Sequence, residues 1–109
     1  MGKQGFLLIG SEAEFPPGSR RLVQVGPDPV LVLRQPDGWV AFVDYCPHRA
    51  GPLSEGTFTH DTVTCPWHAA CFDLKSGKTL SGPGGRGLKT REVQVDATGV
   101  WVAEAPQSL

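Results

Sequence analysis

Short apolar stretches, each bounded by turn-forming residues, follow one another along most of the chain. Each stretch has the length of a β-strand and is too short for an ordinary helix. The strands predicted in this way span residues 6–9, 21–25, 30–33, 39–43, 62–64, 91–95 and 100–103. Asp37-Gly38, between two of these stretches, is a strong hairpin signal, and Ser11 can cap one helical turn over residues 11–14. The pattern therefore predicts an all-β fold of antiparallel sheets.

Apolar positions within these strands identify the core. Residues 91–95 alternate between polar and apolar, as a half-buried strand does. The side chains assigned to the core are Val40, Phe42, Val93, Val95 and Trp101. From about residue 44 to residue 85 a loop-rich segment interrupts the strands, and we expect it to lie at one end of the sheets. Because no linker divides the chain, residues 1–109 are predicted to form a single domain.

Composition and charge restrict the choice of partners. The chain has 109 residues, 39% hydrophobic, with 14 glycines and 10 prolines, which suits one modest, turn-rich core. Ten basic and eleven acidic residues give a net charge of −1, so no basic surface for nucleic acid is expected. No apolar run reaches the roughly 18 to 20 residues of a membrane span, and residues 1–10 lack the pattern of a signal peptide. We expect neither a nucleic-acid nor a membrane partner.

Two short motifs within the loop-rich segment carry the chemistry. Each sets one thiolate and one imidazole in a proline-containing loop, and together they supply four ligands: Cys46, His48, Cys65 and His68. Cysteine and histidine bind zinc or iron-sulfur centres, whereas calcium and magnesium prefer oxygen ligands. Since each motif contributes one ligand of each kind, the pattern favours two inequivalent irons in a 2Fe-2S cluster. A structural zinc site with the same four ligands, without redox activity, stays open as an alternative.

The residues around these motifs extend the comparison to a known family. The sequences CPHRAGPL at 46–53 and CPWHAACFDLKSGK at 65–78 resemble the two cluster-binding boxes of Rieske proteins, and residues 81–85 resemble the family's proline loop. The resemblance implies a Rieske-like antiparallel β-sandwich with a cluster-binding subdomain of two loops at one end. It implies one 2Fe-2S cluster per chain, with Cys46 and Cys65 on one iron and His48 and His68 on the other.

The surroundings of the cluster point to a low reduction potential within the family's range of roughly −150 to +300 mV. In high-potential members of the family, the sequence after the second histidine looks like G-S-x-Y. The serine and tyrosine hydroxyls donate hydrogen bonds to the cluster sulfurs. This chain has Ala70 and Phe72 at those positions, so both donors are missing. It also lacks the additional cysteine pair of those members, since Trp67 occupies one of the two positions. The resemblance is therefore to the ferredoxin branch.

Three neighbouring residues depart from the motif or remain unassigned by it. Ala69 stands where the family most often has glycine. If the backbone has a positive φ at this position, the Cβ of alanine would strain it. Cys71 is interpreted as a small buried filler of the core in preference to a reactive thiol. His60, in the connector between the boxes, is interpreted as a surface turn residue.

Small or apolar residues surround the ligands and predict a largely uncharged docking tip. They are Pro47, Ala50, Pro52, Leu53, Trp67, Ala69 and Pro83. No nucleophile-base pair, flavin site or dinucleotide-binding glycine loop is visible in the sequence, so we expect an electron carrier and not an enzyme. The resemblance favours a ferredoxin that passes electrons from a flavoprotein reductase to a terminal oxygenase of an aromatic-ring dioxygenase. The alternative is a small Rieske-like subunit of an assimilatory nitrite reductase, and a third possibility is a zinc-stapled binding module.

The cysteine count bears on the cellular compartment. The chain has three cysteines, two of which are assigned to the metal, so no disulfide framework can form. We therefore expect a cytoplasmic protein.

Overall fold

The computed structural model describes residues 4–45, 52–66, 70–82 and 87–105, and these form three antiparallel sheets with two single turns of 3-10 helix. Sheet A contains, in spatial order, β1 (Phe6–Gly10), β11 (Gly99–Ala103) and β10 (Val93–Asp96). Sheet B contains β2 (Arg20–Val25), β3 (Asp28–Gln35), β4 (Gly38–Val43) and β9 (Thr90–Arg91). Sheet C contains β5 (Thr57–Phe58), β6 (Thr62–Thr64), β7 (Cys71–Asp73) and β8 (Thr79–Ser81). The turns are η1 (Glu12–Glu14) and η2 (Leu53–Glu55). The predicted all-β antiparallel fold is confirmed.

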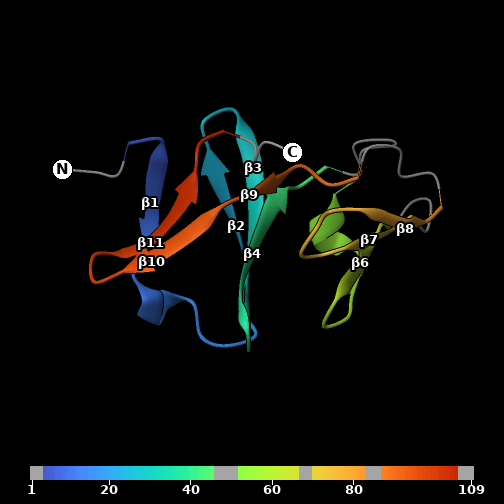
Figure 1. The fold of residues 1–109 in the computed structure, drawn as a ribbon, viewed down its shortest axis with the longest axis horizontal. Helices are drawn as coiled ribbons and strands as arrows, with labels where there is room; N and C mark the ends of the chain where they lie inside the picture. Colours follow the sequence, from blue (N-terminus) through green and yellow to red (C-terminus); the bar gives the residue numbers. More distant parts are fainter. Residues whose placement is uncertain (1–3, 46–51, 67–69, 83–86, 106–109) are drawn as a thin grey trace.

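Sheet B lies between the other two sheets along the long axis of the molecule (Figure 1). One face of its central strands packs into a core shared with sheet A, through Val30, Val32, Ala41 and Val43. The other face packs into a core shared with sheet C, through Leu31, Leu33, Val40 and Phe42. Since successive side chains of a strand point to opposite faces, both faces of β3 and β4 must be apolar. This explains why these strands read as uninterrupted apolar runs.

The sequence predicted one core, and the structure has two. Val40 and Phe42 belong to the core beside sheet C, whereas Val93 and Val95 are half-buried side chains that pack on the core beside sheet A. Trp101 is buried on β11, and its indole N–H donates to the Thr98 hydroxyl at 3.0 Å. All five predicted core residues are therefore at least partly buried, but they do not form a single cluster.

The predicted strand over residues 91–95 is two strands in different sheets. β9 pairs with β4, with Arg91 opposite Ala41, whereas β10 pairs with β11. Glu92 lies between them, at the point where the chain passes from sheet B to sheet A. Alternation of polar and apolar residues gives the period of a strand but does not identify the sheet to which it belongs.

Arg91 is a buried charge that joins sheets A and B. Its Nη2 donates to Asp28 Oδ2 at 2.5 Å, and its Nη1 donates to the carbonyls of Ala103 at 3.3 Å and Glu104 at 3.0 Å. It therefore ties the start of β3 to the end of β11. The residue is 4% exposed, and among the described residues its Nε has no hydrogen-bond partner.

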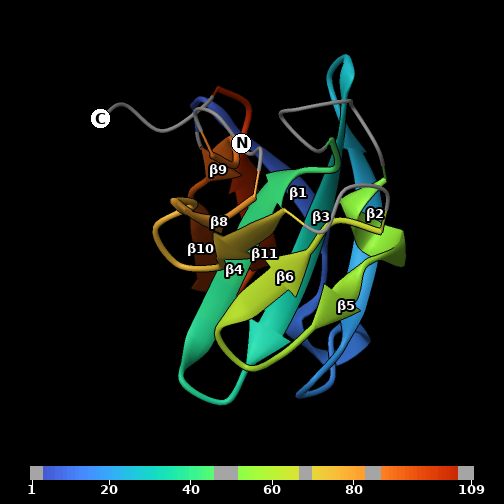
Figure 2. The same ribbon diagram turned by 90° about the vertical axis from the view of Figure 1, so that its right-hand side faces the viewer.

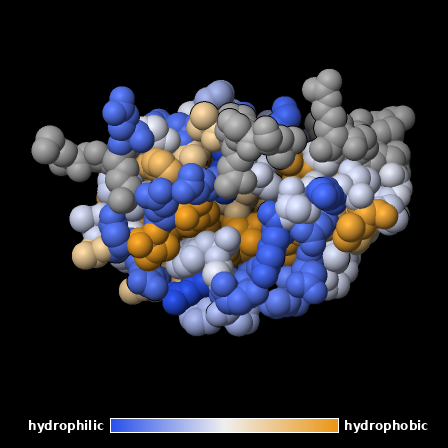
Figure 3. Space-filling view, in the orientation of Figure 1, coloured by the Kyte–Doolittle hydropathy of each residue, from blue (hydrophilic) through white to orange (hydrophobic). Residues whose placement is uncertain are grey.

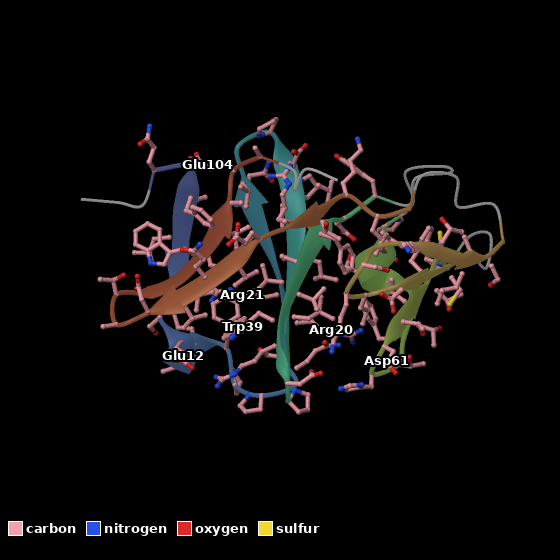
Figure 4. The ribbon with its side chains drawn as sticks, viewed as in Figure 1. Glu12, Arg20, Arg21, Trp39, Asp61 and Glu104 are labelled. Atoms are coloured by element: carbon pink, nitrogen blue, oxygen red, sulfur yellow. The ribbon has the colours of Figure 1, made fainter. Side chains whose placement is uncertain are left out.

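Besides the shared core, three polar or ring contacts join sheet C to sheet B, and Figure 2 shows sheet C in front of sheet B. The guanidinium of Arg20 on β2 lies 4.3 Å from the centre of the Phe58 ring, and Figure 4 shows Arg20 on the side of the sheet that faces sheet C. The Gln35 side chain donates to the carbonyl of His60 at 2.6 Å. Lys75 donates to Asp37 at 2.6 Å, and this hydrogen bond is the main reason that the pKa of Asp37 lies below its usual value. These contacts connect the described part of sheet C to β2 and to the β3–β4 hairpin.

His60 lies in the turn between β5 and β6, as predicted for a surface turn residue. Its side chain is 54% exposed and its ring nitrogens contact Asp61 at 2.9 Å and Asp37 at 3.7 Å. Within the described residues, no helix has the length and apolar character of a transmembrane segment.

Candidate metal centre

Cys65 is the one predicted ligand that lies among the described residues, and it sits one residue beyond the end of β6. It is 2% exposed and forms part of the core beside sheet C, with Leu53, Val63 and Ala70 among its neighbours in that cluster. Cys46, His48 and His68 fall in the ranges 46–51 and 67–69, outside the described residues. Within the described ranges, no group of three histidine, cysteine or acidic side chains is arranged to hold a metal ion.

The second box is closed by a backbone hydrogen bond at its base. The N–H of Cys65 donates to the carbonyl of Ala70 at 2.8 Å, and β6 and β7 continue the pairing with Thr64 opposite Cys71. Residues 66–69 therefore connect two paired strands, so that Cys65 is fixed by the sheet and not by the loop. A ligand held on regular secondary structure keeps a defined position.

The first box is closed by a side chain. Asp44 immediately follows β4, and its Oδ1 accepts the backbone N–H of Ser54 at 2.6 Å while its Oδ2 accepts the Ser54 hydroxyl at 2.8 Å. Asp44 and Ser54 flank the segment that contains Cys46 and His48. The sequence analysis did not identify either residue. An aspartate two residues before the first cysteine was visible, but a contact across ten positions has no signature in a single sequence.

The turn η2, at the end of the first box, packs against the strand that leads into the second box. Leu53 is fully buried in the same core as Cys65. Gly56, which ends η2, lies so close to β6 that a Cβ added to it would be 2.1 Å from the carbonyl oxygen of Thr64. Because any larger residue would push the two segments apart, Gly56 sets a close approach between the end of the first box and the strand that leads into Cys65.

Residues 70–74 alternate between the core and the opposite face of sheet C. Ala70, Phe72 and Leu74 are fully buried, whereas Cys71 and Asp73 are only partly buried. Cys71 therefore does not lie on the core face, and its interpretation as a buried filler is wrong. The alternation was present in the sequence, since Ala70, Phe72 and Leu74 are apolar and Asp73 is not.

The effect of the missing hydroxyl donors on the reduction potential can be tested by introducing one hydroxyl. Ala70 lies on the core face with Cys65, so Ala70→Ser is expected to place a hydroxyl beside the cluster and raise the reduction potential by about 40 to 60 mV. This corresponds to about 1 to 1.4 kcal/mol of stronger hydrogen bonding in the reduced state. Cys71→Ser adds a hydroxyl to the next residue on the opposite face and should leave the potential unchanged. Protein-film voltammetry measures both, and an unchanged potential in Ala70→Ser with a full cluster would contradict the argument.

The predicted docking tip is corrected at one of its two described positions. Leu53 is fully buried, because η2 turns it into the core between the boxes, and Pro52 is half-buried. The remaining residues assigned to the tip lie outside the described ranges. Exposed apolar side chains near the boxes are instead Tyr45, 46% exposed beside the first box, and Leu80, 57% exposed on β8. In Figure 3 a small group of apolar atoms is exposed at the end of the molecule where sheet C lies.

Comparisons with known proteins identify relatives of this chain. A family model described as a Rieske [2Fe-2S] domain matches residues 5–92. Ferredoxin CarAc of Metapseudomonas resinovorans is 36% identical over 92% of this chain and 94% of its own length. Apoptosis-inducing factor 3 of Homo sapiens is 33% identical over 84% of this chain, which spans only 15% of that protein.

Solved structures give the same picture. The structure of a complex of reduced oxygenase and oxidized ferredoxin in carbazole 1,9a-dioxygenase contains a chain with a TM-score of 0.85 and 33% identity, covering 98% of this chain and 100% of its own. A putative nitrite reductase NADPH small subunit has a TM-score of 0.72 and 26% identity, covering 89% of this chain and 96% of its own.

Proposed function

The chain belongs to the Rieske [2Fe-2S] family, and we propose that Cys46, His48, Cys65 and His68 hold its cluster. The described part of the site fits this group, because Cys65 offers a thiolate ligand that is shielded from water and fixed at the end of a strand. The remaining donors follow the spacing of the family's boxes. Two cysteines and two histidines are the ligand set of Rieske centres.

We propose that the protein is a ferredoxin without catalytic activity of its own, which carries single electrons between a flavoprotein reductase and a terminal oxygenase. The observation that carries this proposal is the similarity to ferredoxin CarAc over nearly the whole of both chains. The cluster supplies a one-electron couple when bound. Its two thiolates balance the charge of the oxidised iron-sulfide core, and a neutral cluster accepts an electron more readily than one with four thiolates.

The chain's own residues set the surroundings in which this couple operates. Ala70 and Phe72 present no hydrogen-bond donor on the core face, which favours a potential at the low end of the family's range. The apolar core around Cys65 excludes water from the sulfur side of the site. The exposed Tyr45 and Leu80 offer apolar surface beside the boxes for a partner protein.

The cofactor is tested by visible and low-temperature EPR spectra before and after dithionite, together with iron, zinc and sulfide analysis. We expect two irons and two sulfides per chain and a reduced signal with an average g value below that of the free electron. A colourless protein with one bound zinc ion would instead make this chain a structural or binding module.

The role as a carrier is tested by reconstitution. The full chain is mixed with a flavoprotein reductase and the terminal oxygenase of a carbazole 1,9a-dioxygenase, and product formation is compared with and without the chain. Product formation that depends on the chain supports the role as a ferredoxin.

The similarity to a putative nitrite reductase small subunit favours a second candidate, a subunit that stays docked to a large enzyme. Co-purification as a stable complex with a nitrite reductase would support this second role.

The proposal includes a cytoplasmic location and no partner among nucleic acids or membranes. It is supported by the nearly balanced charge of the chain and by a cysteine inventory in which two of three are assigned to the cluster.

A further inference from the structure

Asp44 is a nearly fully buried carboxylate whose two oxygens both bind one residue. The residue is 6% exposed, and its oxygens accept the N–H of Ser54 at 2.6 Å and the hydroxyl of Ser54 at 2.8 Å. The backbone N–H of Asp44 donates to the carbonyl of Pro29 on β3 at 2.8 Å, which fixes its position relative to sheet B. The side chain therefore connects a fixed point on sheet B to η2.

The other end of this connection is fixed as well. In η2 the N–H of Glu55 donates to the carbonyl of Pro52 at 3.0 Å, and the N–H of Gly56 donates to the carbonyl of Leu53 at 2.9 Å. Leu53 is buried beside Cys65, and Gly56 is in close contact with the carbonyl of Thr64. Ser54 thus belongs to a turn that is packed against the strand leading into the second box.

A buried carboxylate needs an explanation beyond stability. Removing a charge from water costs free energy, and apolar residues of similar volume often serve equally well where only packing is required. A buried polar contact can instead serve to specify one geometry, and we apply this hypothesis to Asp44 and Ser54. Here the geometry concerns the nine residues 45–53, which contain Cys46 and His48 and whose two ends Asp44 joins.

We propose that Asp44 is a positioning residue for the cluster, which closes the first ligand loop through Ser54 and holds it in register with Cys65. The inference rests on the ligand set proposed above. Asp44 has no contact with the iron in this scheme, and it acts by setting the separation between the two boxes. Without it, the connection between the end of β4 and η2 is lost, while the strand pairing of sheets A and B does not depend on it.

The chain provides a matched control. Asp73 accepts the N–H and the hydroxyl of Ser76, both at 2.7 Å, so it binds a serine through the same two groups. The N–H of Ser76 is the main reason that the pKa of Asp73 lies below its usual value. This pair closes only the short turn between β7 and β8 and encloses no proposed ligand. Asp73→Ala therefore removes a pair made by the same two serine groups and an equal charge, from a more exposed site and without a proposed ligand in the enclosed turn.

The experiment compares the cluster-loaded full chain with Asp44→Ala, Asp44→Asn and Asp73→Ala. Loss of visible absorbance is followed after dithionite reduction in excess bathophenanthroline, and the reduced EPR spectrum and the urea midpoint are recorded for each. Asp44→Ala is expected to lose its cluster on the order of tenfold faster or more, with broadened EPR lines. Asparagine can accept the N–H and donate to the hydroxyl, so Asp44→Asn should stay within about threefold of the natural chain.

Cluster retention in Asp44→Ala equal to that of the natural chain would overturn the proposal, as would equally fast loss in Asp73→Ala. Unchanged EPR lines in Asp44→Ala would reduce Asp44 to a general stabilising role. If Asp44→Ala assembles no cluster, Ser54→Ala, which removes one of the two bonds, replaces it and must show faster loss. If the natural chain itself did not bind two irons, the proposed ligand set would be wrong. That outcome is distinguishable from a failure of the proposal for Asp44, which concerns only the variants.

Discussion

Replacement of Cys65 by serine is expected to abolish the visible and EPR spectra of the cluster. A serine oxygen is a poor substitute for a thiolate on iron, and Cys65 lies in an apolar core where neither water nor a described polar side chain can take its place. We expect less than about a tenth of the iron content of the natural chain. The backbone N–H of residue 65 keeps its bond to the carbonyl of Ala70, so the strand pairing of sheet C remains available.

Cys71→Ser is the control for this substitution. It makes the same chemical change six positions along the chain, on the face of β7 that points away from the core. Iron content and spectra should be unchanged. If Cys71→Ser removed the cluster and Cys65→Ser did not, the assignment of the two cysteines would have to be exchanged.

Replacement of Arg91 by alanine is expected to lower the free energy of unfolding by about 3 kcal/mol, which is the lower end of the range for broken buried ion pairs. The side chain of Asp28 is 34% exposed, so water can solvate part of the charge that loses its partner. The carbonyls of Ala103 and Glu104 also lose a donor. With a slope of about 1.5 kcal/mol per M for a small domain, the urea midpoint should fall by about 2 M.

Arg21→Ala tests whether burial is responsible. Arg21 pairs with Glu14 at 3.1 Å, but both side chains are about half exposed. An exposed pair of this kind contributes less than about 1 kcal/mol. Circular dichroism of the loaded protein in urea gives both midpoints. Equal effects of the two substitutions would show that the buried contacts of Arg91 do not determine its contribution.

The regular part of the fold was largely predictable from the sequence. Strands 6–9, 21–25, 30–33, 39–43, 62–64 and 100–103 correspond to β1, β2, β3, β4, β6 and β11, because each is an apolar stretch between turn formers. β5, β7, β8 and η2 were not predicted. They have two or three residues each, so they show too little periodicity, and apart from residues 62–64 the sequence analysis assigned this segment to the loops of the two boxes.

For the candidate site, the candidate ligand residues could be predicted from the sequence, but the contacts around them could not. The proposed ligands were identified from residue type and spacing, and Cys65 is the one among them that the structure describes. The contacts that close the boxes, from Asp44 to Ser54 and from Gly56 to Thr64, depend on how segments far apart in the sequence meet. Leu53 is an example. From the sequence it was predicted to lie on the surface because it is an apolar residue in a loop, but in the structure η2 places it in the core.

The position of sheet B between two cores has a consequence for how such a protein can change. Neighbouring residues such as Val32 and Leu33 lie on one strand but belong to separate cores. Where residues of the two clusters lie more than about 7 to 10 Å apart and share no partner, their substitutions have nearly additive effects on stability. Packing around the cluster can therefore diverge, and with it the potential, while the sandwich of sheets A and B is kept. Because sheet B separates the two cores, natural selection can change the core next to the proposed cluster nearly independently of the core between sheets A and B.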